Sequence, residues 1–251
     1  MIAARGLGFA VGSRPILRGL DFTVAAGDLL LVCGRNGAGK STLLRLLAGR
    51  LAASCGQALL AGRDLSSYGR RELATRLSYL PQGDEFSLPL LVRDVLRAGR
   101  YPYRNLFRGF DRRDQAAFAA GVEKFGLAGL LERNVQTLSG GERKKVLLAA
   151  AFIQDVPLLL LDEPLAALDP GSSLGLASEL AALQREGKTI VVVSHEIERF
   201  LPLATRMLAL DRGELCYFGP KTFSPALLHR VFGVTFRMAR VEGREIVYAE
   251  K

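Results

Sequence analysis

The segment that most constrains the fold is a glycine-rich loop between an apolar run and a helical one. The apolar run is LLLVC, residues 29–33, and the loop is GRNGAGKST, residues 34–42. A loop of the form G-x-x-x-x-G-K-[ST] between a strand and a helix holds phosphate groups on its backbone amides. Glycines permit the backbone geometry that brings these amides together, and the helix start adds partial positive charge. The sequence therefore predicts a nucleotide-binding P-loop.

Two side chains of this loop carry its chemistry. We expect Lys40 to reach the β- and γ-phosphates of a nucleotide and the Ser41 hydroxyl to bind Mg²⁺. The alternative, an accidental glycine-rich turn, leaves the flanking strand and helix unexplained. The predicted nucleotide contacts are Gly34, Arg35, Asn36, Gly37, Ala38, Gly39, Lys40, Ser41 and Thr42.

Four apolar runs that do not alternate with polar residues, at 29–34, 157–163, 189–196 and 207–213, end in polar residues. Such runs are typical of strands buried on both faces of a parallel sheet. Helical stretches at 40–51, 172–187 and 197–204 separate them. We therefore predict an α/β fold of the P-loop NTPase (RecA-like) type, with a mostly parallel sheet.

Two regions depart from this alternation. Residues 1–40 and 57–61 predict short strands of an antiparallel patch, and residues 88–151 are helical without a convincing strand. We therefore divide one domain, residues 1–251, into a core (1–87 and 152–215) and an inserted helical lobe (88–151). The tail, residues 216–251, has short strands around a helix at 224–232 and is expected to pack on the core.

The run LLLLDEP places Asp162 and Glu163 at the end of a buried strand. Ligands bind at the carboxyl edge of open α/β sheets, and adjacent buried acids are costly unless a cation needs them. We expect Asp162 to bind Mg²⁺ and Glu163 to act as general base on the attacking water. His195 ends the next strand and is expected to contact the γ-phosphate or this water. For Asp162 and Glu163 the alternative is a solvated end of a strand, and for His195 it is an ordinary polar residue at a strand end.

A second glycine-rich loop, TLSGGERKKV at residues 137–146, opens another helix. Ser139 and Glu142 have the spacing of a capping box, which is the simpler interpretation. That interpretation does not explain Gly140 and Gly141, since each glycine near a helix start costs about 0.5–1 kcal/mol relative to alanine. A hydroxyl, bare amides and a helix start form a second anion site. We expect this site to close over the γ-phosphate held by another copy of the chain.

Composition excludes several other classes of protein. Hydrophobic residues make up 49% of the chain, and no apolar run is long enough for a transmembrane helix or an export signal. Cys33, Cys55 and Cys216 are scattered, so we expect small buried side chains rather than disulfides or a zinc site. The net charge of +9 is compatible with nucleic acid, an anionic membrane surface or nucleotides. No basic block with interleaved aromatic residues favours nucleic acid, and none is expected as a partner.

These motifs, together with Gln82 in YLPQG, LAALD at 165–169 and SH at 194–195, resemble the nucleotide-binding subunit of ATP-binding cassette (ABC) transporters. The resemblance implies two subunits paired head to tail around two ATP molecules. In such a pair Ser139, Gly140 and Gly141 would contact the partner's γ-phosphate, and Asp169 would bridge the two sites. Gln82 would join the Mg²⁺ site to a lobe that docks on integral membrane permease subunits. The resemblance also implies a cytoplasmic protein, peripheral on the inner face of the cell membrane.

The stretch GRYP at 99–102 and the tail at 224–249 resemble the ATPase subunits of iron–siderophore, haem and cobalamin importers. This resemblance implies import of a metal chelate, with an extracytoplasmic solute-binding protein as an indirect partner. Importers of zinc, manganese or another solute, and ABC-type ATPases of DNA repair or chromosome maintenance, remain alternatives. One position departs from the family, whose members stack adenine on an aromatic residue where this chain has Val11. Phe9 lies two residues before it and is better explained as core packing.

Overall fold

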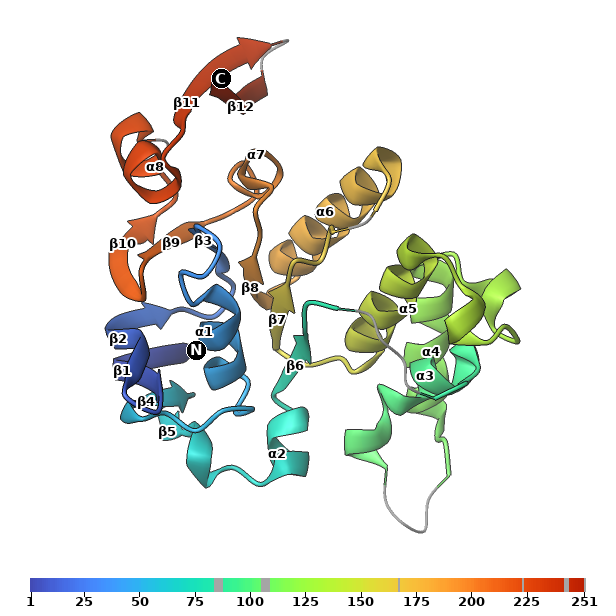
Figure 1. Cartoon of the computed structure of the whole chain (residues 1–251). Helices are drawn as coiled ribbons and strands as arrows, with labels where there is room; N and C mark the ends of the chain where they lie inside the picture. The colour runs from blue at the N-terminus through green and yellow to red at the C-terminus, as the bar shows by residue number, and fades with distance from the viewer. Residues whose placement is uncertain (84–87, 105–108, 167, 223, 242–243, 251) are drawn as a thin grey trace.

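The computed structural model describes residues 1–83, 88–104, 109–166, 168–222, 224–241 and 244–250 (Figure 1). Its centre is a six-stranded sheet, whose strands are β3 (Leu29–Gly34), β6 (Leu77–Leu80), β7 (Leu158–Asp162), β8 (Thr189–Val193), β9 (Arg206–Asp211) and β10 (Glu214–Pro220). They lie in the order β10-β9-β3-β8-β7-β6. All neighbours are parallel except β9 and β10. The predicted mainly parallel α/β sheet is therefore confirmed.

The antiparallel patch is a separate four-stranded sheet. It contains β1 (Ile2–Val11), β2 (Arg14–Val24), β4 (Cys55–Leu60) and β5 (Arg63–Asp64), in the order β2-β1-β4-β5. Strands β1 and β2 have 10 and 11 residues, so the expectation of short strands is wrong for this hairpin. Their register shifts at three places, which lets the long strands twist while both stay paired.

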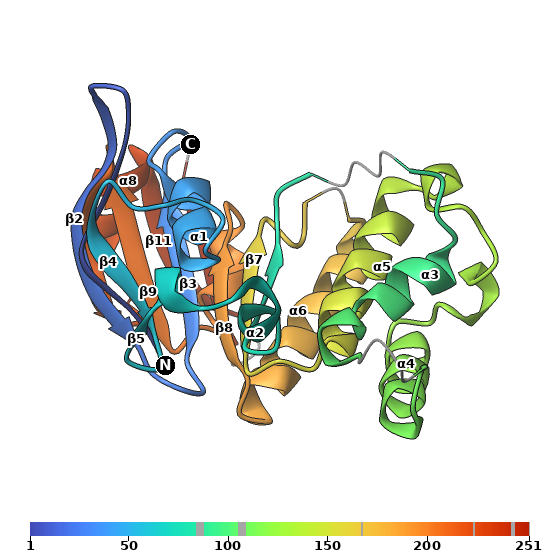
Figure 2. The ribbon, with the colours of Figure 1, turned by 90° about the horizontal axis from the view of Figure 1, so that it is seen from below.

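Helices cover both faces of the central sheet. The helices are α1 (Lys40–Leu47), α2 (Arg70–Ala74), α3 (Val92–Ala98), α4 (Arg112–Lys124), α5 (Gly140–Ile153), α6 (Pro170–Arg185), α7 (Ile197–Phe200) and α8 (Pro225–Phe232), with short 3-10 turns η1 (Leu65–Ser67), η2 (Tyr101–Tyr103), η3 (Ala128–Leu130) and η4 (Val135–Thr137). Helix α1 lies between the two sheets, and α6, α7 and α8 pack on the opposite face (Figure 2).

Strand β3 shows why both faces are apolar. Leu30 and Val32 belong to the core around α1, whereas Leu29, Leu31 and Cys33 belong to the core under α6 to α8. Side chains alternate between the faces of a strand, so a strand covered on both sides must be apolar at every position. This explains the continuous apolar run from which the strand was predicted.

The helical lobe has its own core, formed mainly by α3, the turns that follow α4, and α5. Helix α5 ends at Ile153, so it passes the lobe boundary of 151 set from the sequence. A buried ion pair between Arg100 Nε and Asp114 Oδ1, at 2.7 Å, joins η2 to the first turn of α4. Both side chains are less than a tenth exposed, which makes this contact part of the lobe's interior.

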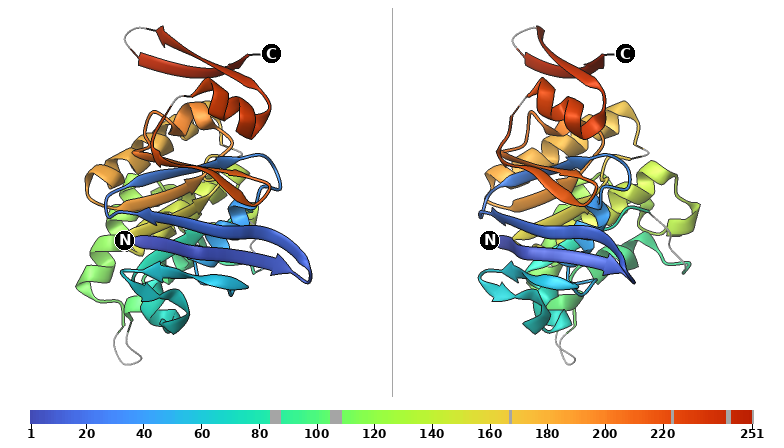
Figure 3. Two further views of the ribbon diagram at one scale, coloured as in Figure 1. Left: turned by 90° about the vertical axis from the view of Figure 1, so that its left-hand side faces the viewer. Right: turned by 60° about the vertical axis from the view of Figure 1, so that its left-hand side comes forward.

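The tail differs from the expectation in one respect. Strand β10 pairs with β9 in the central sheet, so a tail that begins at residue 216 divides a strand of the core. After β10, Leu228 and Val231 of α8 pack on the core. The chain ends in an antiparallel hairpin of β11 (Thr235–Val241) and β12 (Arg244–Glu250), which stands out from the body of the molecule (Figure 3). Among the described residues, no helix has the length and apolar character needed to cross a bilayer.

Candidate nucleotide-binding and catalytic site

The P-loop connects β3 to α1, as predicted, and three of its glycines have positive φ angles. These angles are 151° at Gly34, 78° at Gly37 and 98° at Gly39. A Cβ atom on Gly34 would collide with the carbonyl oxygen of Leu210, and one on Gly39 would lie 2.5 Å from a methyl group of Leu17. Only glycine fits these positions. The loop therefore leaves its amides and the start of α1 free of side chains, as a phosphate site requires.

Lys40 closes this loop from inside. Its ammonium group donates hydrogen bonds to the carbonyl oxygens of Gly34 at 2.8 Å and Arg35 at 2.9 Å. Burial lowers the pKa of Lys40, and the carboxylates of Glu163 and Asp162 oppose that shift. The ammonium group is therefore held by hydrogen bonds to the backbone of the loop, and its charge interacts with the carboxylates of Asp162 and Glu163. A triphosphate would replace carbonyl acceptors with phosphate oxygens that bear full negative charge.

Asp162 is the last residue of β7, and it is 1% exposed. Neither carboxylate oxygen has a hydrogen-bond partner of normal geometry among the described residues. Burial raises the pKa of Asp162, although the Ser41 hydroxyl and the cations of Arg45 and Lys40 act against this. A buried carboxylate without a partner is costly unless a ligand needs it. The donor set of Asp162 and Ser41, all oxygen, fits Mg²⁺.

Glu163 follows in an unusual backbone conformation, with φ at 51°. Its amide donates to the carbonyl oxygen of Val193 at 3.0 Å, which ties the residue to the end of β8. The backbone of His195 donates to Glu163 Oε2 at 3.3 Å, and His195 Nε2 lies 3.2 Å from Oε1. Burial raises the pKa of Glu163 and lowers that of His195. The structure therefore brings together the two residues that the sequence placed at neighbouring strand ends.

Gln82 comes two residues after β6, the strand next to β7. Leu80 at the end of β6 pairs with Leu161, which places Gln82 at the same edge of the sheet as Asp162. Gln82 is exposed and makes no hydrogen bond to another described residue. Gln82 thus lies near this edge of the sheet but forms no hydrogen bond to Asp162 or Glu163.

Two residues beside the P-loop, Asp211 and Arg212, were not expected from the sequence motifs. A cavity of about 310 Å³ is lined by Arg35, Asn36, Gly37, Ala38, Asp211 and Arg212. Asp211 ends β9, the strand next to β3, and Arg212 follows in the turn to β10. These two residues could have been found from the apolar run at 207–213. The polar end of this run follows a strand parallel to β3, so it lies at the same edge of the sheet as the P-loop.

The second glycine-rich loop lies in the helical lobe. Ser139 caps α5: its hydroxyl accepts from the Glu142 amide at 3.2 Å, and Glu142 Oε2 accepts from the Ser139 amide at 2.8 Å. The simpler interpretation, a capping box, is thus correct for Ser139 and Glu142. Gly140 and Gly141 lack positive φ angles, and a Cβ atom would meet nothing at Gly140 and only Leu168 at 3.6 Å at Gly141. The fold of this chain does not require either glycine.

The two glycine-rich loops do not meet within one chain. Figures 1 and 2 place α1 beside the antiparallel sheet and α5 in the helical lobe. Among the described residues, no hydrogen bond joins 139–141 to 34–42. Asp169 is likewise exposed, and its carboxylate caps α6 by accepting from the Ser172 amide at 3.0 Å. The rest of the predicted LAALD motif is described except for residue 167.

The cysteines only partly fit their prediction. Cys33 is buried next to the P-loop, where burial raises the pKa of its thiol to about 12. Cys55 is exposed, so the expectation of a buried side chain is wrong there. Cys216 is partly buried, and no disulfide joins the three.

Comparison with known proteins identifies the family of this chain. Residues 17–166 match the family described as "ABC transporter". This chain is a member of the ABC transporter family. Two relatives are hemin import ATP-binding proteins HmuV: one from Streptomyces coelicolor, 41% identical over 92% of this chain and 83% of the relative, and one from Rhodopseudomonas palustris (strain HaA2), 35% identical over 93% and 90%. The predictions of an ABC family member and of an ATP-hydrolysing enzyme are therefore confirmed.

Solved structures agree with this ABC assignment. A metal-chelate type ABC transporter in an inward-facing conformation superposes with a TM-score of 0.84 at 25% identity, covering 99% of this chain and 96% of that one. An ATP-binding cassette in a dimeric post-hydrolysis state, bound to ADP and Pi, has a TM-score of 0.78 at 22% identity and covers 89% and 100%. The second match shows the shared fold of this ABC ATPase.

The residue at the expected adenine position of this ABC ATPase is exposed. Val11 ends β1 and is 63% exposed, opposite Arg14 in the hairpin register. Phe9 is partly buried against the core around α1, in line with its interpretation as core packing. The structure therefore supplies no aromatic ring in the place of Val11.

Proposed function

We propose that this chain is the ATPase subunit of an importer for haem or a closely similar metal chelate. The observation that carries the proposal is 41% identity with a hemin import ATP-binding protein over 92% of this chain. A further relative with the same description, from Nocardia farcinica (strain IFM 10152), is 37% identical over 92% of this chain, and the similarity to a metal-chelate type transporter covers 99% of it. The similarity thus extends over the helical lobe and the tail as well as the ATPase core.

Two copies of the chain act as a head-to-tail pair. Gly140 and Gly141 support this arrangement, because each has room for a side chain and neither needs a glycine backbone. Bare backbone at an exposed helix start is useful where a ligand approaches closely. The γ-phosphate held by the partner's P-loop is that ligand. Asp169 is exposed and follows Leu168, whose side chain lies beside Gly141, and it contacts the partner across the interface.

Within each site, Glu163 takes a proton from the attacking water. Its Oε1 atom is buried and has no hydrogen-bond partner of normal geometry, so it is available as an acceptor. Lys40 and the glycine amides hold the phosphates, while Asp162, Ser41 and Gln82 hold Mg²⁺. When bound, Mg²⁺ neutralises charge on the phosphate oxygens. His195 orients Glu163 and contacts the γ-phosphate from its exposed side.

Integral membrane proteins hold the chain at the membrane. Integral permease subunits dock on its helical lobe, from the cytoplasmic face of the membrane, and receive the motion produced by ATP binding and hydrolysis. An extracytoplasmic solute-binding protein delivers the cargo to those permease subunits and does not touch this chain.

The test is transport by the assembled complex in proteoliposomes. The chain is co-purified with its permease, and uptake of haemin, a ferric siderophore, cobalamin and Zn²⁺ is compared with ATP inside the vesicles and the solute-binding protein outside. We expect ATP-dependent uptake of haemin, abolished in a complex that carries Lys40→Ala. Uptake of another solute without haemin would contradict the assigned cargo. Failure to co-purify with any permease would contradict the importer role itself.

A further inference from the structure

Two segments at the lower end of the molecule in Figure 1, helix α2 and the chain between α3 and α4, are rich in arginine. Residues 97–113 contain six arginines and one acidic residue. The helix α2 adds two more arginines at its start. Among the exposed arginines that the structure describes in these segments, Arg97 lies over the rings of Phe110 and Phe118, and we call the other five the arginine patch: Arg70, Arg71, Arg104, Arg112 and Arg113.

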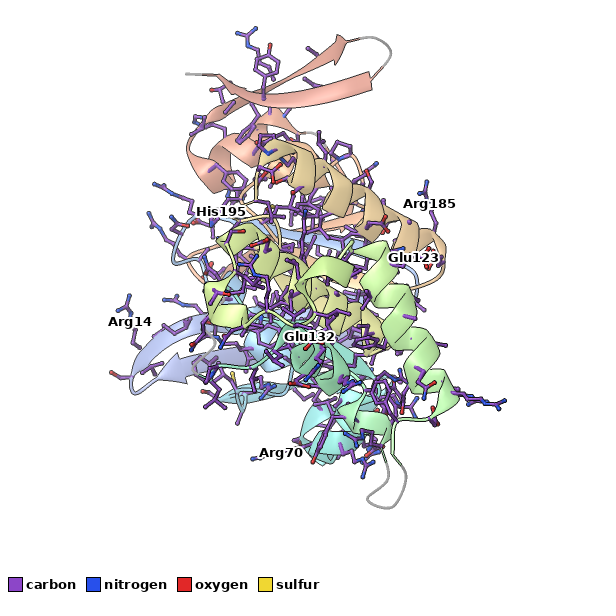
Figure 4. The ribbon with its side chains drawn as sticks, turned by 90° about the vertical axis from the view of Figure 1, so that its right-hand side faces the viewer. Arg14, Arg70, Glu123, Glu132, Arg185 and His195 are labelled. Carbon is purple, nitrogen blue, oxygen red and sulfur yellow. The ribbon has the colours of Figure 1, made fainter. Side chains whose placement is uncertain are left out.

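Contacts within the chain hold these segments together. Arg71 Nε donates to the carbonyl oxygen of Pro102 at 2.9 Å, which ties α2 to η2. The buried pair of Arg100 and Asp114 ties η2 to the start of α4. Figure 4 shows the labelled Arg70 at the lower end and Glu123 near the far end of α4, so α4 begins at the same end as Arg70. The patch is one surface built from three segments.

Carboxylates of this region are already engaged. Glu72 pairs with Arg63 at 2.8 Å, and Asp111 caps α4 by accepting from the Asp114 amide at 2.9 Å. No ion pair to a described residue involves Arg70, Arg104, Arg112 or Arg113. Apart from the electrostatic attraction between Arg113 and Asp111, the described carboxylates therefore leave the positive charge of the patch without a partner.

The fold does not benefit from two of these charges. Arg112 and Arg113 are the first two residues of α4, where the helix dipole favours acids and disfavours cations. Their position costs helix stability, so an interaction outside the chain explains them better. Tyr101 is the first residue of η2, one of these three segments, and is 71% exposed. Tyrosine beside arginine is typical of the interface between a membrane and water.

We propose that the arginine patch binds anionic lipid headgroups of the cytoplasmic leaflet. Clusters of four to eight basic residues are attracted to this leaflet because its surface is negatively charged. A permease loop matches the patch less well, since cytoplasmic loops of membrane proteins carry an excess of lysine and arginine themselves. This inference rests on the proposed function only in that it places the chain beside a membrane.

The test is flotation of the full chain with lipid vesicles. Phosphatidylcholine vesicles are compared with vesicles that also contain about 30% phosphatidylglycerol. We expect binding only to the anionic vesicles, and release as salt rises from about 0.05 M to about 0.5 M. Equal binding to both vesicle types would overturn the proposal, as would salt-insensitive binding. No cargo is involved, so this result is independent of which solute the transporter carries.

Matched variants locate the binding surface. The triple change Arg104→Gln, Arg112→Gln and Arg113→Gln should weaken binding about fivefold per arginine, on the order of a hundredfold in total. The control changes three exposed arginines outside the patch, Arg5, Arg185 and Arg230, of which Arg185 lies at the opposite end in Figure 4. We expect the control to bind almost as the wild type does. Equal loss in both variants would overturn the assignment of the patch.

Two further measurements separate lipid from other partners. ATP hydrolysis in the absence of vesicles should be unchanged in the patch variant, since none of its three residues lies at the nucleotide site. Tighter binding to duplex DNA than to anionic vesicles, through the same arginines, would assign the patch to nucleic acid and overturn the proposal. The patch variant could also bind vesicles as tightly as the wild type but fail to co-purify with the permease. That result would assign the patch to a protein interface and would equally overturn the proposal.

Discussion

His195 contacts both carboxylate oxygens of Glu163: its amide donates to Oε2 at 3.3 Å, and its Nε2 atom lies 3.2 Å from Oε1. Burial and the nearby Lys40 lower the pKa of His195, which favours the neutral form of its ring. The contact with Oε1 lacks hydrogen-bond geometry and leaves that oxygen as a free acceptor. The backbone thus fixes the carboxylate, while one oxygen stays available for a proton.

Glu163→Gln removes the proposed general base and keeps the shape of the side chain. We expect ATP binding to persist and turnover to fall by about 10²–10⁴, the usual contribution of a general base. Because ATP stays intact, the variant should accumulate as an ATP-bound dimer. Turnover measured by phosphate release, with gel filtration in ATP, checks both effects. Hydrolysis near the wild-type rate would refute the role of Glu163.

Asp162→Asn should stabilise the nucleotide-free chain at neutral pH. The raised pKa of Asp162 means that the folded state holds its proton more tightly than the unfolded state does. Stability from this group is therefore present at low pH and is lost as pH rises through the folded pKa. Removing the charge should raise the free energy of unfolding at pH 7 by on the order of 1 kcal/mol.

Urea unfolding of Asp162→Asn and wild type at several pH values tests this account. The difference between the two proteins should shrink as pH falls through the raised pKa of Asp162. A variant that is less stable at pH 7, or a difference independent of pH, would show that the carboxylate is satisfied within the chain. The variant should also lose the Mg²⁺ dependence of ATP binding.

Gly140→Ala tests whether glycine is required at this position for dimerisation rather than for the stability of the monomer. A Cβ atom meets nothing at this position, so the monomer should be as stable as the wild type or more stable by up to about 1 kcal/mol. ATP-induced dimerisation should weaken and turnover should fall, because the methyl group would enter the space of the partner's γ-phosphate. Analytical ultracentrifugation with ATP measures the first effect.

Two other glycines serve as controls for Gly140→Ala. Gly175→Ala, in an open position of α6, should leave dimerisation unchanged. Gly34→Ala should destabilise the monomer itself, because its Cβ atom would collide with Leu210. Normal dimerisation and turnover in Gly140→Ala would refute the assigned role of this loop.

Val11→Tyr should increase discrimination between ATP and GTP. Without an aromatic ring at this exposed position, the wild type has less to distinguish the two bases, and they should compete almost evenly. A tyrosine would add stacking contact with adenine. Competition binding against a fluorescent ATP analogue measures both proteins. A strong preference for ATP in the wild type would show that adenine binds elsewhere.

The sequence predicted those parts of the fold whose pattern is local. The strand of Leu29–Gly34 was readable because burial on both faces demands apolar residues throughout. Strand β6 was missed because it has four residues and includes Ser78 and Tyr79, so it forms no apolar run. The pairing of β10 with β9 was missed because it depends on a tight turn at Arg212 and Gly213, both with positive φ angles.

The candidate site was predictable to a similar extent. Motif spacing placed Lys40, Asp162 and Glu163 at one sheet edge, and the structure brings them within electrostatic reach of one another. The positive φ angle of Glu163 and the cavity beside Arg212 depend on how neighbouring strands end, which no single motif encodes. The Arg100–Asp114 pair likewise joins residues with no shared motif.

The most direct test of the account is a structure of Glu163→Gln with Mg²⁺ and ATP. We expect a head-to-tail pair in which residues 139–141 of each chain contact the γ-phosphate held by the P-loop of the other. A triphosphate bound by one chain alone, with residues 139–141 facing solvent, would contradict it.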